Sequence, residues 1–111
     1  MIDREKWKEL WGALAQETYE TVCSKGFTHD NPSEAIALMH SELSEALEAM
    51  REGRTDSTKI PPFSALEAEL ADTVIRIMDH GWAHGLDVAG AIVAKVKYNA
   101  TRAHRHGGKK F

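Results

Sequence analysis

Apolar and polar residues follow the 3.6-residue period of α-helices along most of this chain, and no segment competes with the two-residue period of a strand. Four segments of this kind are separated by glycines, prolines and runs of polar residues. The pattern therefore predicts an all-α protein with four helices.

The first two helices are bounded by clear start and stop signals. The first is predicted over 3–24, ending at Gly26. The second is predicted to start at Asn31, with Glu34 completing a capping box, and to end at Gly53. One broad apolar face is expected on it, formed by Ala35, Ile36, Met39, Leu43, Ala46, Leu47 and Met50.

The last two helices follow a polar loop that closes with two prolines. A second capping box at Ser64 begins the third helix, which is expected to end at Gly81 or Gly85. The fourth begins after Asp87 and is expected to run to about His104.

Four amphipathic helices with mostly short connections predict a four-helix bundle, with one domain over residues 1–111 and a flexible basic tail from about 105. The helices carry more apolar surface than one small bundle can bury, so we expect a homodimer or homotetramer. The first helix alone contributes Trp7, Leu10, Trp11 and Leu14.

Two acidic pairs interrupt the edges of the apolar faces. Glu42 and Glu45 are three residues apart on the second helix, and Glu69 and Asp72 repeat this spacing on the third, so each pair projects from one side of its helix. If the two helices pack together, four carboxylates converge in a partly buried place. Their pKa values then rise and the fold is destabilised unless a cation joins them.

A hard divalent cation such as Mg²⁺ or Mn²⁺ prefers oxygen ligands, so the four carboxylates predict a metal site. A solvated acidic face is the simpler interpretation of either pair alone. A di-iron centre is disfavoured because it needs Glu-x-x-His on two helices, and no glutamate here precedes a histidine by three residues. His80 and His84, four residues apart, could form half of a zinc site.

Charge is distributed unevenly over the 111 residues, whose net charge is −3. The last seventeen residues hold six Lys or Arg and no acid, which leaves eight basic and seventeen acidic residues in the other 94. An acidic body with a basic end suits a site where acids hold metal and cations meet a polyphosphate. It also fits a protein that binds nucleic acid.

Three features of the sequence predict a cytoplasmic protein without a membrane partner. Its single cysteine, Cys23, cannot form an internal disulfide. The N-terminal segment lacks the apolar stretch of a signal peptide, and no apolar run approaches the roughly 20 residues of a membrane span.

The two acidic motifs together resemble the signature of the MazG-like, all-α nucleoside triphosphate pyrophosphohydrolases. They are Glu42-x-x-Glu45 and, after 23 further residues, Glu69-x-x-Asp72. The segments ELADTVIRIMD and KVKYNATRAHRHGGKKF extend the resemblance over about 27–111. It implies a four-helix subunit assembled as dimers or tetramers. It also implies Mg²⁺-dependent hydrolysis of a nucleoside triphosphate to the monophosphate and pyrophosphate.

The resemblance assigns the metal to Glu42, Glu45, Glu69 and Asp72, with Mn²⁺ as a possible substitute for Mg²⁺. Metal held there would contact phosphate oxygens and lower the pKa of a bound water, which attacks the α-phosphorus. Glu45 is a candidate catalytic residue, because it could take the proton from that water instead of binding metal.

The resemblance also implies residues that bind the substrate. Lys95, Asn99 and Arg102 are spaced along one face of the fourth helix and would neutralise the leaving pyrophosphate, with Lys95 counted as catalytic. Phe27 and His29 would lie beside the base.

Two other functions stay open at this stage. One is a phosphoribosyl-ATP pyrophosphohydrolase, an enzyme of the same structural group. The other is a non-catalytic helical protein that binds nucleic acid or another partner through its basic end, in a salt-sensitive way and without metal. We expect a nucleotide-pool enzyme, and nucleic acid is the less favoured partner.

Overall fold

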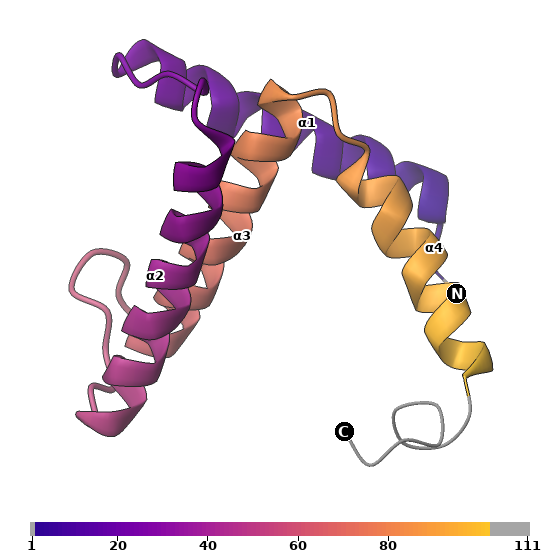
Figure 1. The fold of residues 1–111 in the computed structure, drawn as a ribbon. Coiled ribbons are helices and arrows are strands. Elements are labelled where there is room, and N and C mark those ends of the chain that lie inside the picture. Colours follow the sequence, from indigo (N-terminus) through magenta and orange to yellow (C-terminus); the bar gives the residue numbers. More distant parts are fainter. Residues whose placement is uncertain (1, 103–111) are drawn as a thin grey trace.

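The structure, a computed structural model, describes residues 2–102, and within this range it contains four α-helices and no strand (Figure 1). The helices are α1 (Arg4–Ser24), α2 (Pro32–Arg51), α3 (Ala65–Ala83) and α4 (Val88–Thr101). The predicted all-α class and the number of helices are confirmed. The predicted end of the fourth helix at His104 and the tail from about 105 lie outside the described residues.

The predicted N-caps form the expected local hydrogen bonds. Ser64 and Glu67 make a complete capping box: the Ser64 hydroxyl accepts from the Glu67 N–H at 3.0 Å, and the Glu67 carboxylate accepts from the Ser64 N–H at 2.9 Å. Asn31 accepts from the Glu34 N–H at 3.1 Å, but Glu34 returns to the Asn31 side-chain amide instead of its backbone. The capping box predicted for α2 is therefore only half formed.

Of the two glycines proposed to end α3, Gly85 does so. Its φ of +65° is the left-handed conformation that glycine adopts without strain at a helix C-terminus. Gly81 stays inside the helix, where an added Cβ would lie 3.0 Å from a methyl group of Val88. Gly81 therefore lets the start of α4 approach α3 closely.

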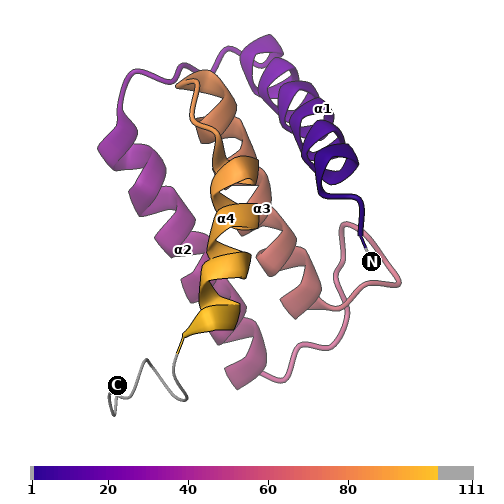
Figure 2. The same ribbon diagram turned by 90° about the vertical axis from the view of Figure 1, so that its right-hand side faces the viewer.

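The helices pack in pairs rather than around a common axis. α2 runs antiparallel along α3, α1 packs across α3, and α4 packs on α1 (Figures 1 and 2). Ile92, Val93 and Val96 of α4 line a pocket with Trp7 near the start of α1. After its first turn α4 runs apart from the α2–α3 pair, as Figure 1 shows, so the four helices do not close into a bundle within one chain.

The buried apolar residues of the described chain are five alanines and one methionine: Ala15, Ala46, Ala49, Ala65, Ala89 and Met78. The broad apolar face predicted for the second helix is buried only in part: Ala46 is buried, whereas Leu43, Leu47 and Met50 are exposed. α2 turns Glu42, Ala46 and Ala49 toward its neighbour instead. The two alanines let the helices approach closely, and Glu42 finds a cationic partner there. None of the described helices has the length and hydropathy that crossing a membrane requires.

We expect Ser64→Ala to lower the free energy of unfolding by about 1 kcal/mol, because the backbone N–H of Glu67 loses the serine hydroxyl that accepts its hydrogen bond. Urea unfolding followed by circular dichroism measures this loss. Ser44→Ala is the matched control, since Ser44 is exposed in the middle of α2. Equal stability of Ser64→Ala and the wild type would show that the capping box does not hold the start of α3.

Candidate metal centre

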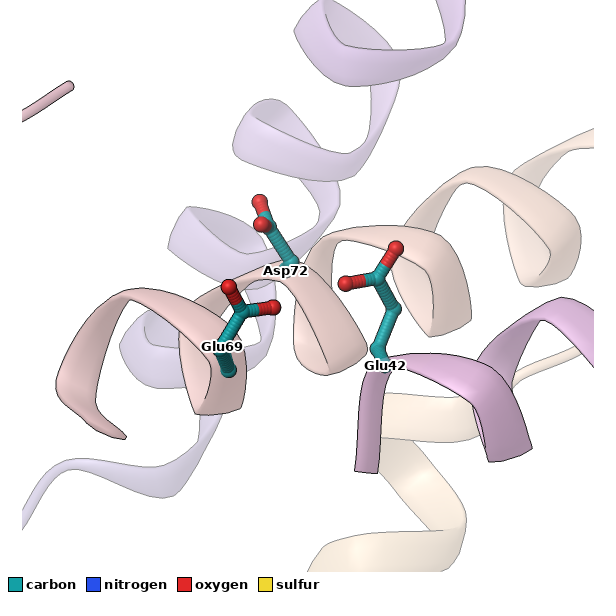
Figure 3. Close-up of side chains that lie close together, drawn as sticks. All are labelled: Glu42, Glu69 and Asp72. Carbon is teal, nitrogen blue, oxygen red and sulfur yellow. The ribbon is translucent and has the colours of Figure 1, made fainter. Parts of the chain in front are cut away.

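The antiparallel pairing of α2 and α3 brings Glu42 of α2 next to Glu69 and Asp72 of α3 (Figure 3). One carboxylate oxygen from each residue lies within 4.8 Å of the others. Ligand bonds of about 2.1 Å place the oxygens around Mg²⁺ about 3 to 4 Å apart, so a small closure of these side chains would complete three ligand positions. This acidic triad could hold a metal ion.

Glu42 is buried, with only 8% of its surface exposed, although it carries a carboxylate. The Nε–H group of Arg76 donates to Glu42 Oε1 at 2.9 Å and neutralises part of this charge. The pattern of acidic pairs in the sequence did not point to Arg76. Its position four residues after Asp72, on the same face of α3, was the available signal. Arg76 thus holds Glu42 through one of its two carboxylate oxygens.

Glu69 is the least satisfied member of the triad. Its Oε2 atom is buried and has no hydrogen-bond partner among the described residues. Burial, followed by the neighbouring carboxylates of Glu45 and Glu42, raises the pKa of Glu69 to about 7. Because its near neighbours are other acids, the Glu69 carboxyl group is favoured either in its protonated form or beside a cation.

The charges of the centre suit a divalent cation. Three carboxylates and the Arg76 guanidinium sum to −2, so one divalent ion makes the group neutral. Carboxylate oxygens suit hard ions such as Mg²⁺, Mn²⁺ and Ca²⁺. A bound ion would also satisfy the buried oxygen of Glu69.

Three of the four predicted metal ligands therefore come together, and Glu45 takes a different position. Its carboxylate is close enough to Glu69 to raise that residue's pKa, yet it is exposed and lies outside the group of three converging oxygens. An exposed carboxylate at the edge of the centre is better placed to accept a proton than to be an inner ligand.

The residues expected to lie beside the base occupy the connection between α1 and α2. Phe27 is 67% exposed. The His29 ring lies 5.0 Å from that of Tyr19, and its Nε2 atom is 2.8 Å from a carboxylate oxygen of Asp79. Asp79 follows Asp72 by seven residues, which is about 10 Å along the helix. His29 is therefore held two turns of α3 away from the acidic triad.

The predicted phosphate-binding residues, Lys95, Asn99 and Arg102, are exposed at the far end of α4. The Lys95 ammonium group lies over the ring of Tyr98, 5.0 Å from its centroid. Because α4 runs apart from α2 and α3, one chain does not bring these residues to the acidic triad (Figure 1). The spacing of these residues within one helix could not show how far they lie from the acidic triad.

Other residues singled out from the sequence do not form a second metal centre within the described range. The rings of His80 and His84 lie 4.6 Å apart, and no third ligand converges on them. The rings of Trp7 and Trp11 lie 5.5 Å apart, and both side chains are half-buried.

Comparisons with protein-family models, with curated proteins and with solved structures found no significant match to this chain. The resemblance to the MazG-like hydrolases therefore stays a prediction from the sequence.

The raised pKa of Glu69 predicts that stability falls as pH rises from 4.5 to about 7 in the presence of a chelator. Below 4.5 the folded and unfolded chains both hold the proton. Between 4.5 and 7 only the folded chain holds it, so the unfolded state becomes relatively more stable, and this loss persists at higher pH. The melting temperature should fall by roughly 5 °C across this window.

Glu69→Gln tests the cause, because glutamine keeps the shape of the side chain and cannot ionise. We expect this variant to lose most of that pH dependence and to melt above the wild type at pH 7.5 in chelator. Glu17→Gln, an exposed position on α1, is the control and should retain the wild-type profile. An unchanged profile for Glu69→Gln would contradict the assignment.

Proposed function

We propose that this chain is a metal-dependent hydrolase that cleaves a nucleoside triphosphate to the monophosphate and pyrophosphate. The observation that carries the proposal is the buried, unpartnered oxygen of Glu69 inside a group of three carboxylates. A fold gains no stability from burying like charges, so a site of this kind is better explained by a cation that it binds. The resemblance of the acidic motifs to those of MazG-like enzymes supplies the reaction.

Glu42, Glu69 and Asp72 would hold Mg²⁺, with Mn²⁺ as a substitute. The ion would supply charge neutralisation for phosphate oxygens and a more acidic water as nucleophile. Arg76 positions Glu42 through its hydrogen bond and limits the negative charge of the empty site. Glu45 is the proposed general base, because it is exposed beside Glu69.

The polar residues of α3 suggest how an extended substrate would lie. Asp72, Arg76 and Asp79 recur at intervals of four and three residues and so form one stripe along the helix. The stripe begins at Asp72 in the acidic triad and ends at Asp79, whose carboxylate contacts the His29 ring. A triphosphate at the triad would direct the nucleoside along this stripe toward Phe27 and His29.

Lys95, Asn99 and Arg102 could contact a substrate at the acidic triad only in an assembly of two or more chains. We propose that the chain forms a homodimer or homotetramer and that these residues meet the phosphates of a site on another subunit. Their cationic and amide groups suit the charge that develops on the leaving pyrophosphate.

Millimolar Mg²⁺ or Mn²⁺ should raise the melting temperature by binding only the folded state, and a panel of nucleoside triphosphates should yield pyrophosphate when Mg²⁺ is present. Glu42→Gln and Asp72→Asn should remove both effects while circular dichroism shows unchanged helix content. Glu17→Gln is the control variant. Phosphoribosyl-ATP belongs in the panel, because it tests the related activity directly.

Two results would contradict the proposal. One is a melting temperature that no divalent cation changes at pH 7.5. The other is metal binding without pyrophosphate release from any substrate in the panel. Salt-sensitive binding of an oligonucleotide without metal, together with no hydrolysis, would instead favour the non-catalytic alternative.

Arg102→Ala should lower kcat/KM about 10- to 150-fold, the equivalent of losing a charge-assisted contact of roughly 1.5–3 kcal/mol in the transition state. Steady-state kinetics of pyrophosphate release measures the change. Lys97→Ala is the matched control, because Lys97 is an exposed cation on a different face of α4. Equal losses in the two variants would indicate a general effect of charge and refute the specific role of Arg102.

A further inference from the structure

A small apolar pocket lies between the start of α1 and the middle of α4, where α4 runs apart from the α2–α3 pair (Figure 1). Its volume is about 150 Å³. We name it the α1–α4 pocket, and one cationic and five apolar residues line it: Arg4, Ile2, Trp7, Ile92, Val93 and Val96. The α1–α4 pocket shares no residue with the acidic triad.

The local sequence explains both walls of this pocket. Its three residues on α4 are spaced by one and three positions, so they share one face of that helix. On α1, Asp3 is the N-cap, and its carboxylate accepts from the Lys6 N–H at 3.0 Å. Ile2 and Trp7 therefore occupy the two positions of a hydrophobic staple, one before the N-cap and one at the fourth helical residue.

Arg4 is the exception in this apolar setting. Its Nη1 atom is buried and has no hydrogen-bond partner among the described residues, and no described carboxylate forms an ion pair with its side chain. Residues outside the described range, Met1 and 103–111, contain no acidic side chain that could pair with it. A guanidinium nitrogen that is buried without an acceptor is costly. The acidic side chains of this chain leave that cost in place.

Helix stability does not account for an arginine at this position. Arg4 is the first residue of α1, where the positive end of the helix dipole disfavours a cation. A carboxylate from a ligand would satisfy the group that the chain leaves unpaired. Its two oxygens match the parallel N–H groups of a guanidinium, and one such anion balances the single positive charge of the pocket.

The volume and lining of the pocket limit the rest of the ligand. An apolar cavity of about 150 Å³ holds a molecule the size of benzene. Trp7, Ile92 and Val93 are half-buried and offer apolar and aromatic contacts, whereas Ile2 and Val96 are more than half exposed at the edge of the pocket. A nucleoside does not suit these walls, because its polar base and sugar atoms would lose water without finding hydrogen-bond partners.

We propose that the α1–α4 pocket binds a small carboxylate with an apolar body of about six carbon atoms, of which an aromatic acid is the simplest example. The carboxylate pairs with the Arg4 guanidinium, and the apolar body lies against Trp7 and α4. This ligand differs from the substrate of the proposed hydrolase in charge and polarity, and its site is built from other helices than the acidic triad. The inference therefore does not depend on the proposed activity.

Benzoate is the probe, and two matched compounds separate its parts. Benzamide keeps the ring without the negative charge, and acetate keeps the charge without the ring. We expect benzoate to bind with a dissociation constant of about 1 mM or below. Benzamide should bind about tenfold or more weakly, and acetate should show no binding at about 10 mM. Titrations followed by two-dimensional NMR measure these affinities, and the signals that benzoate shifts should include those of Trp7, Ile92 and Val93.

Arg4→Gln tests the guanidinium directly, because glutamine removes its positive charge. This variant should weaken benzoate binding about tenfold or more and leave the affinity for benzamide nearly unchanged. Lys6→Gln is the matched control, because Lys6 is an exposed cation two residues away that does not line the pocket, and it should bind benzoate as the wild type does. Val96→Phe fills the pocket and should weaken benzoate and benzamide alike, which keeps the test decisive if Arg4→Gln does not fold.

Four results would overturn the proposal. They are no binding of benzoate to the wild type at about 10 mM, equal affinities for benzoate and benzamide, benzoate shifts confined to residues outside the pocket, and unchanged benzoate binding by Arg4→Gln. None of these titrations involves the acidic triad or a metal ion. The pocket and the hydrolase proposal can therefore each fail alone.

Discussion

The close antiparallel contact between α2 and α3 is the interaction on which the rest of the structure depends. Ala46, Ala49 and Ala65 bring the two helices together, and the same contact buries Glu42. A buried carboxylate is tolerated only with a counter-charge, which Arg76 provides across the interface. Glu69 has no such partner, and burial beside other carboxylates raises its pKa to about 7. The fold thus keeps an unbalanced negative charge in a defined place, which is the physical basis of the proposed metal site.

Packing through small residues has a second consequence. Because the alanines occupy the contact between α2 and α3, the larger apolar side chains of α2 are exposed. α1 covers the apolar side chains of α3 only near the C-terminal end of α3. α4 does not cover the remainder, since it packs on α1. The arrangement of helices is consequently open, and many large apolar side chains of the described residues are exposed.

Within one chain, the cationic residues of α4 lie away from the acidic centre. If they act on the phosphates of a substrate, they do so from another subunit. Catalysis at the acidic centre would then require the assembly, whereas metal binding would not.

The sequence by itself determined the all-α class, the four helices and most of their ends. These features depend on neighbouring residues, such as the capping box of Ser64 and the left-handed Gly85. It also indicated the acidic pairs, because a spacing of three residues is a property of one helix. Only the tertiary structure decided that Glu45 lies outside the converging oxygens, that Arg76 pairs with Glu42, and that Leu43 and Leu47 are exposed. Each of these facts depends on how one helix is rotated against another. The small size of the alanines and the pairing of the buried Glu42 with Arg76 set that rotation. The periodicity of one helical segment cannot predict it, because it describes that segment alone.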